Sequence, residues 1–200
     1  MQRRVYTNRL NMRTCAICTP EIYNSEDMQR QILDNRKANP WIFDIIHNKH
    51  NIEPRKNCII KRPEWTLVMH RVKHNSEKEK ANSVWKYLIV FHDENLHSLR
   101  HLREQHINLL KEIKKVVTTA MQMRPESFHL TRRPNTVHVY FHYWPSVFQL
   151  HAHVVTQDCY RPVYRCHDFK HVIRNLSRDG EWYKKAMLMT TFNRTIQKLC

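Results

Sequence analysis

The clearest periodicity in the chain predicts a long amphipathic helix. Between residues 98 and 123, apolar side chains recur every three or four positions, with Lys and Arg on the other side. Two shorter helical segments are expected within residues 26–50, divided at Pro40, because proline discourages helix at the residue before it. Residues 169–176 also read as helix, whereas residues 181–200 fit helix and strand equally well.

Strand patterns occur on both sides of the long helix. The apolar run at 84–91 predicts a centrally buried strand, and shorter strands are expected at 56–60 and 64–70. Residues 135–143 and 149–155 alternate with a period of two, and the very short connection between them indicates an antiparallel pair. The predicted class is therefore α+β, with an antiparallel sheet on which the long helix packs.

The composition restricts the partners of the chain. Lys and Arg total 34 against 18 Asp and Glu, a formal net charge of +16, which favours an anionic partner such as nucleic acid, a nucleotide or a phospholipid headgroup. A basic surface that only maintains solubility is the alternative. Glycine-rich phosphate loops are excluded, since the chain has one glycine. No apolar run is long enough for a transmembrane helix, so no membrane association of that kind is expected.

Cysteine and histidine spacings offer only weak metal sites. Cys15 and Cys18 have a spacing found in zinc sites, but a second close pair is missing. His97 and His101, four residues apart on the predicted helix, could share a metal or simply lie on a helix face. We expect no metal and no other cofactor. The six irregularly spaced cysteines are interpreted as mostly free thiols in a reducing compartment.

The segment "QLHAHVV" carries candidate chemistry. A strand period places Gln149, His151 and His153 on one face. A neutral imidazole can attack phosphorus near neutral pH, and a second imidazole can donate a hydrogen bond to a phosphate oxygen or leaving group. The two histidines could also be metal ligands or plain cross-strand neighbours, and the pair alone does not decide between these readings.

The wider sequence resembles a known family. "QLHAHVV" resembles the histidine triad motif, His-φ-His-φ-His-φ-φ, and the longer string "VYFHYWPSVFQLHAH" is similar to the motif of scavenger mRNA decapping enzymes. "YLIVFHDENLHSLRHLREQHINLLKEI", "VIRNLSRDGEWY", "TPEIYNSED" and "NPWIFDII" resemble other parts of that family. The resemblance covers about residues 17–195.

The resemblance implies a fold and an assembly. The family consists of homodimers with a histidine triad α+β domain and a smaller, swapped N-terminal β-lobe. We therefore expect residues 1–38 to be a remnant of that lobe and its hinge, and residues 39–200 to form a histidine-triad-like catalytic domain. A homodimer in the cytoplasm, the nucleus or both is the corresponding expectation.

The resemblance also implies an activity. Family members cleave the 5′-5′ triphosphate of short capped RNA fragments or the cap dinucleotide and release 7-methylguanosine monophosphate. His151 then matches the nucleophile, which would form a phosphohistidine. Stacking of Trp41 on the methylated base would contribute about 1–2 kcal/mol, since that base is a cation. The other site residues that the resemblance implies contact phosphate, open the Pro-Ser turn or bind the guanine edge: His153, Ser146, His142, Lys73 and Glu53.

Three positions depart from the family pattern. Gln149 stands at the first triad histidine, His70 or a neighbour stands at an aspartate, and Val147 stands at a tyrosine. Glutamine can donate a hydrogen bond but cannot carry a proton charge. The alternative function is therefore a cap-binding, nucleotide-binding or RNA-binding protein that does not cleave its ligand.

Overall fold

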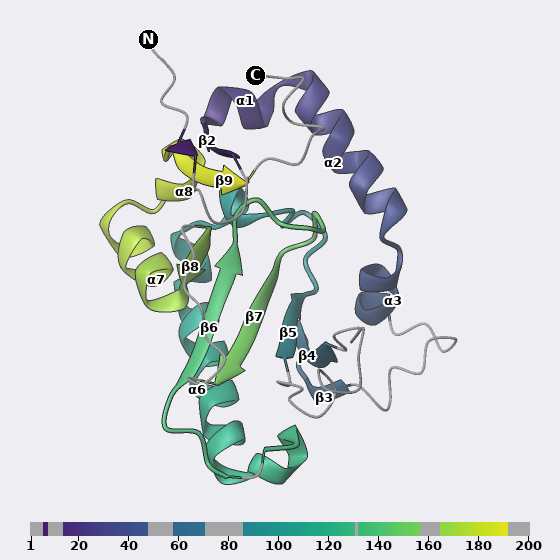
Figure 1. Cartoon of the computed structure of the whole chain (residues 1–200), viewed down its shortest axis with the longest axis vertical. Helices are drawn as coiled ribbons and strands as arrows, with labels where there is room; N and C mark the ends of the chain where they lie inside the picture. Colours follow the sequence, from purple (N-terminus) through teal and green to yellow (C-terminus); the bar gives the residue numbers. More distant parts are fainter. Residues whose placement is uncertain are drawn as a thin grey trace.

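A six-stranded antiparallel sheet forms the centre of the computed structural model (Figure 1). The structure describes residues 6–7, 14–47, 58–70, 86–130, 132–156 and 165–191. The strand order in the sheet is β3-β4-β5-β7-β6-β8. The strands are β3 (Cys58–Lys61), β4 (Trp65–His70), β5 (Lys86–Phe91), β6 (Val137–His142), β7 (His151–Thr156) and β8 (Cys166–Asp168). The expected antiparallel pairing of the two alternating segments is confirmed, because β6 pairs with β7.

A second, smaller sheet joins the two ends of the described chain. Its strands are β1 (Tyr6–Thr7), β2 (Thr14–Cys18) and β9 (Leu188–Thr191), and β2 pairs antiparallel with β9. The ambiguous segment after residue 181 contains both kinds of element, the short helix α8 (Trp182–Lys185) followed by β9. Figure 1 shows this sheet at one end of the molecule, beside α1 (Pro20–Asn24).

Helix α6 (Ile107–Met123) covers one face of the large sheet (Figure 1). Its buried residues, Leu110, Ile113, Val117 and Met121, recur at helical spacing and belong to the same apolar core as Tyr87, Ile89 and Phe91 of β5. Helix α7 (Phe169–Arg178) also packs against α6 and β6. The prediction of an α+β fold with an antiparallel sheet under a long amphipathic helix is confirmed.

The predicted start of that helix, at residue 98, is wrong. Residues 98–106 instead contain two short 3₁₀ turns, η1 (Leu99–His101) and η2 (Glu104–His106). The Ser98 side chain accepts from the Arg100 N–H, and Leu102 then adopts an extended backbone. Apolar residues such as Leu99 and Leu102 are still buried, so apolar spacing alone could not reveal the interruption.

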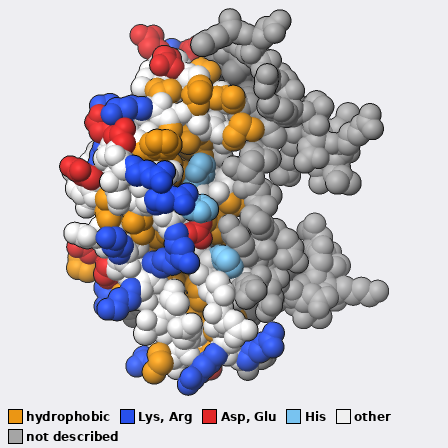
Figure 2. Space-filling view, turned by 90° about the vertical axis from the view of Figure 1, so that its left-hand side faces the viewer, with side chains coloured by type: hydrophobic (Ala, Val, Ile, Leu, Met, Phe, Trp, Pro, Cys, Tyr) orange, Lys and Arg blue, Asp and Glu red, His pale blue; other side chains and the backbone are white. Residues whose placement is uncertain are grey.

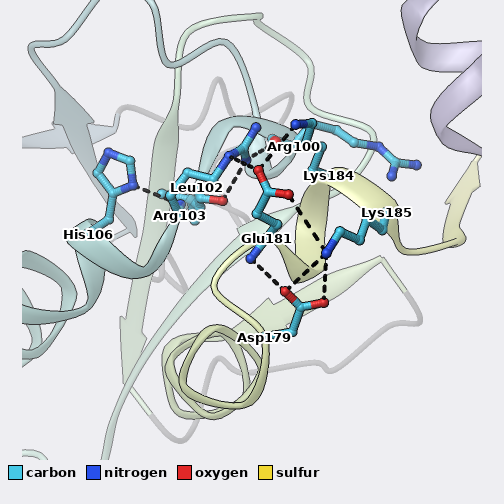
Figure 3. A network of polar contacts seen from close by, with 8 residues as sticks. All are labelled: Arg100, Leu102, Arg103, His106, Asp179, Glu181, Lys184 and Lys185. Carbon is cyan, nitrogen blue, oxygen red and sulfur yellow. Dashed lines mark hydrogen bonds and ion pairs between the residues drawn. The ribbon is translucent and has the colours of Figure 1, made fainter.

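Polar contacts hold this interrupted segment against the chain near α8 (Figure 3). The Glu104 N–H donates to the Gly180 carbonyl at 3.1 Å, and Arg103 lies 3.9 Å from a Glu181 carboxylate oxygen. The Arg103 N–H also donates to His106 Nδ1 at 2.9 Å. These contacts satisfy backbone groups that a continuous helix would have used within itself.

Three helices precede the large sheet in the chain. Helix α1 is followed by α2 (Glu26–Ala38) and α3 (Trp41–His47), so the predicted division at Pro40 is confirmed. A further short helix, η3 (Pro125–Phe128), follows α6. In the part of the chain that the structure describes, no helix is long and apolar enough to cross a membrane. The proposed domain division at residues 38 and 39 stays a prediction.

Helix α3 lies over the face of the sheet opposite α6. Its Ile42 packs with Leu88 and Val90 of β5 in a second apolar cluster. Residues directly opposite each other in an antiparallel ladder share a face. Leu88 pairs with His153 and Val90 with His151, so both histidines lie on the α3 side of the sheet. We call this side the histidine face.

Candidate active site

His151 is held in one tautomer by the chain just before it. It is the first residue of β7, its side chain is 7% exposed, and its Nδ1 lies 2.7 Å from the Gln149 carbonyl oxygen. A carbonyl oxygen can only accept, so Nδ1 carries a proton, and in the neutral ring the lone pair is therefore on Nε2. The ring is thus oriented as a nucleophile requires, with the basic nitrogen opposite the fixed one.

Aromatic side chains gather around His153 on the histidine face. The His153 ring centroid lies 4.2 Å from that of His142, 5.4 Å from Tyr140 and 5.5 Å from His151. The Tyr140 and His153 rings are stacked, with an angle of 16° between their planes. The structure therefore brings together three histidines predicted from the sequence and adds Tyr140. Its place in the strand alternation, two residues before His142, could have indicated it.

His142 is a neutral group at physiological pH. Burial lowers the pKa of its imidazole to about 3, and the nearby positive charge of Arg165 contributes to the shift. The ring can therefore offer one N–H to a phosphate oxygen without becoming a cation. It contributes hydrogen bonding to the site and no fixed charge.

The Gln149 side chain is fully buried and fully bonded. Its amide nitrogen donates to the carbonyl oxygens of Phe91 and Asp93, both at 2.9 Å, and its oxygen accepts from Arg36 Nη1 at 3.1 Å. Gln149 lies in a segment of bends before β7. The observed strand therefore begins at His151, two residues later than the predicted range of 149–155. Gln149 thus ties β7 to β5 and α2, while its backbone carbonyl orients His151.

Two residues at the end of α2 hold the segment that leads into the site. Asn35 donates to the Ser146 carbonyl at 3.1 Å and accepts from the Phe148 N–H at 2.9 Å. Arg36 donates to the Phe148 carbonyl at 2.9 Å as well as to Gln149. Sequence reasoning missed both residues, since more than a hundred residues separate them from their partners. Ser146 itself is exposed.

Trp41 lies at the start of α3, on the histidine-face side of the sheet. Its side chain is 36% exposed, whereas the next residue, Ile42, is fully buried against β5. Ile42 thus holds the helix on the sheet without help from the indole. The exposed ring surface of Trp41 is available to stack on a planar ligand.

Other predicted site residues are placed only in part or not at all. Glu53 and Lys73 lie outside the described residues, as does the whole charged connector at 71–83. His70 ends β4 opposite Lys86, which puts its backbone beside β5. The roles predicted for all these residues stay predictions.

The candidate metal ligands have other surroundings. The rings of His97 and His101 lie 4.9 Å apart, and burial lowers the pKa of His101 to about 4. The Cys18 Sγ accepts a hydrogen bond from the Tyr143 hydroxyl at 3.2 Å. Among the described residues, no group of three or more His, Cys, Asp or Glu side chains is arranged to hold a metal ion.

Comparisons with known proteins place this arrangement in a family. Residues 40–166 match the family described as "Scavenger mRNA decapping enzyme C-term binding". The chain is 34% identical over 151 residues to the m7GpppX diphosphatase of Sus scrofa, an alignment that covers 74% of this chain and 42% of the relative. It is 32% identical to the Homo sapiens protein of that name over 155 residues, with coverages of 74% and 42%.

More distant proteins were also found. The m7GpppX diphosphatase of Schizosaccharomyces pombe is 23% identical over 160 residues, covering 78% of this chain and 48% of the relative. A solved structure, Hnt3 in complex with DNA and guanosine, covers 83% of this chain and 91% of its own, with a TM-score of 0.42 and 17% identity, too distant to bear on function. This chain spans less than half the length of the curated relatives that it matches. The match over residues 40–166, which includes the histidine face, shows that the chain belongs to the scavenger mRNA decapping enzyme family.

Proposed function

We propose that this chain hydrolyses the 5′-5′ triphosphate of short capped RNA fragments or of the cap dinucleotide. The observation that carries the proposal is the tautomer of His151, whose protonated Nδ1 donates to the Gln149 carbonyl and leaves Nε2 as a nucleophile. Membership of the family and the names of the relatives, m7GpppX diphosphatases, support the same substrate class.

The reaction begins with attack of His151 on phosphorus. The Nε2 lone pair forms an N–P bond to the phosphorus next to 7-methylguanosine, and the bond from that phosphorus to the bridging oxygen breaks. The oxygen leaves with the bonding pair as part of the diphosphate-bearing product. The imidazole of the intermediate is positively charged, and the Gln149 carbonyl accepts its Nδ1–H, which stabilises that charge.

Water completes the reaction. It attacks the same phosphorus, the N–P bond breaks, and its electron pair returns to Nε2, so that 7-methylguanosine monophosphate is released and His151 is restored. The proton lost by water goes to the solvent. His153 and neutral His142, whose rings lie 4.2 Å apart, donate hydrogen bonds to the phosphate oxygens.

Recognition of the cap is assigned to Trp41, with Ser146, Lys73 and Glu53 as the remaining substrate contacts. A methylated guanine is a flat cation, and the exposed indole of Trp41 offers it stacking and cation–π attraction. We further propose a homodimer, in the cytoplasm, the nucleus or both. No cofactor takes part in the proposed steps.

A second candidate function is cap binding without cleavage, which the position of Gln149 favours. Its buried amide is committed to three structural hydrogen bonds, so it cannot relay a proton as a histidine could. One titration separates the two candidates. Cap dinucleotide is added in the presence of EDTA while tryptophan fluorescence is recorded, and the nucleotides are then separated.

Quenching with release of 7-methylguanosine monophosphate supports the hydrolase. Quenching with intact dinucleotide supports the binding protein. Absence of both quenching and product rejects both candidates. Unmethylated GpppG is the matched ligand control, because it lacks the positive charge that Trp41 is proposed to recognise.

A further inference from the structure

A row of residues crosses the sheet from β5 to β8 and passes through the candidate active site. Its members are opposite one another in successive antiparallel pairs, and so share the histidine face: Leu88, His153, Tyr140 and Asp168. Neighbouring strands are about 4.8 Å apart, which places Tyr140 one strand from His153. Tyr140 therefore borders the proposed phosphate site on the side of β8.

The Tyr140 ring contacts both imidazoles that are proposed to bind phosphate. It is stacked on His153, with the ring centroids 5.4 Å apart and 16° between the planes, and its centroid lies 5.3 Å from that of His142. The centroids of the two imidazoles are 4.2 Å apart. The three rings thus pack as one group, and the tyrosine is the member that carries no imidazole nitrogen.

The plane of an imidazole is set by the groups that pack against it. The torsion that turns a histidine ring has broad, roughly two-fold preferences, so the backbone alone does not fix the direction of the ring N–H. Rotation of the His153 ring out of the stack would drive its edge into the face of Tyr140. Because a hydrogen bond weakens steeply once its donor angle falls below about 120°, a fixed ring plane favours donation to a phosphate oxygen.

The residue on the other side of Tyr140 has a separate role. The Asp168 carboxylate is the N-cap of α7 and accepts from the Lys170 N–H at 2.7 Å. Tyr140 stands between Asp168 and His153 in the order of the strands. An aromatic ring, rather than a carboxylate, is therefore the direct neighbour of the imidazole, and negative charge is kept further from a phosphate bound there.

We propose that Tyr140 is a positioning residue: its ring, stacked on His153 and packed beside His142, holds both imidazoles in the orientation in which they donate hydrogen bonds to the phosphate oxygens. The inference rests on the proposed function, which assigns phosphate contact to these two histidines. Tyr140 acts through them, so its contribution comes from the aromatic ring and does not require the hydroxyl.

The test measures kcat and KM for m7GpppG in three variants that are shown to be folded by circular dichroism. Tyr140→Leu removes the ring, Tyr140→Phe restores it without the hydroxyl, and Tyr183→Leu makes the same change beside His167, outside the site. For Tyr140→Leu we expect kcat to fall at least about tenfold, since misplacement of a group by 1 Å can cost about a hundredfold. KM should change little, because Trp41 is proposed to bind the cap. Tyr140→Phe should recover most of the lost kcat, and Tyr183→Leu should keep the wild-type value.

The NMR signals of the histidine rings provide a readout that does not require turnover. Ring protons that lie over an aromatic face resonate upfield. The His153 signals, identified by their absence in His153→Asn, should be shifted in the wild type and in Tyr140→Phe but not in Tyr140→Leu. Figure 2, seen from the side of α7 and β8, shows histidine side chains at the surface beside Lys and Arg. The signals of His171, an exposed residue of α7, are the reference and should be the same in every protein.

Addition of m7GpppG to the NMR samples separates this inference from the proposed function. If the wild type leaves the dinucleotide intact, but its His153 signals move on binding as those of Tyr140→Phe do and those of Tyr140→Leu do not, hydrolysis is rejected and the positioning role is kept. His153 signals that do not respond in the wild type would overturn the inference.

Three further results would also overturn it. The first is a Tyr140→Leu variant with the kcat and the His153 signals of the wild type. The second is a Tyr140→Phe variant as impaired as Tyr140→Leu, which would assign the role to the hydroxyl. The third is an equal loss of kcat in Tyr183→Leu, which would show that any loosened aromatic contact has the same effect.

Discussion

At the scale of single residues, Gln149 combines two roles in one position. Its backbone carbonyl fixes the His151 tautomer, while its side chain joins three separate parts of the fold through Arg36 and the carbonyl oxygens of Phe91 and Asp93. A neutral imidazole has one N–H and could not donate to both carbonyls. Glutamine therefore suits the structural role that this position has here.

Replacement of Gln149 by methionine should destabilise the protein. Methionine has a similar shape but leaves the buried Phe91 carbonyl oxygen and the partly buried Asp93 carbonyl oxygen without their donor. The buried, unsatisfied group costs about 1–3 kcal/mol. Urea unfolding of Gln149→Met measures the loss. The control is Gln105→Met at an exposed position. A loss within about 0.5 kcal/mol for Gln149→Met would contradict the structural role.

Removal of the Trp41 indole should weaken cap binding without unfolding the protein. A lost cation–π contact of about 1–2 kcal/mol corresponds to a roughly 5–30-fold higher Kd for a methylated cap analogue. Calorimetric titration of Trp41→Ala measures it. Trp182→Ala is a matched control, since Trp182 is 40% exposed and lies on α8. Equal affinities of the two variants would exclude Trp41 from recognition.

At the scale of elements, the end of α2 determines the path of the chain into β7. Asn35 and Arg36 provide hydrogen bonds to the backbone at Ser146 and Phe148, where no strand pairing is available. Helix α3 then covers part of the same sheet face through Ile42. The segment 26–47 thus positions both the strand of the proposed nucleophile, His151, and the proposed cap-stacking helix.

Loss of the Asn35 contacts should loosen this junction locally. In Asn35→Leu, the Phe148 N–H loses its acceptor and its hydrogen exchange should become faster, with a stability loss of about 1–2 kcal/mol. Amide exchange followed by mass spectrometry provides the readout. Asn35→Asp keeps an acceptor for Phe148 and should retain protection there. Unchanged exchange in Asn35→Leu would show that α2 does not hold the loop.

At the scale of the whole molecule, partly buried histidines make stability depend on pH. Burial lowers the pKa to about 4 for His101 and His167, and to about 3 for His142. Between pH 6.5 and these values the unfolded chain binds more protons than the folded one, so stability falls as pH falls. We expect urea midpoints to decrease steadily from pH 6.5 to 4.

His167→Phe should reduce this dependence. His167 is packed against Tyr183, and replacing it removes one group that must titrate on unfolding. The slope of unfolding free energy against pH should be shallower by up to about 1.4 kcal/mol per pH unit in that window. A variant with the slope of the wild type would contradict the assigned pKa of His167.

The parts of the fold that the sequence predicted are those that follow from periodicity. Alternation located β6 and β7, and helical spacing located the buried residues of α6. The interruption at residues 98–106 was missed because it depends on a contact with Gly180. The partner of Gln149, Arg36, is 113 residues away in sequence, and no local pattern connects the two.

The central claim is that His151 is the nucleophile of a metal-independent cap hydrolase. The most direct test is turnover of m7GpppG by the wild type and by His151→Asn, both with EDTA and both shown to be folded by circular dichroism. The wild type should release 7-methylguanosine monophosphate, and His151→Asn should release none above background. An inactive wild type, or a variant that is as active as the wild type, would contradict the claim.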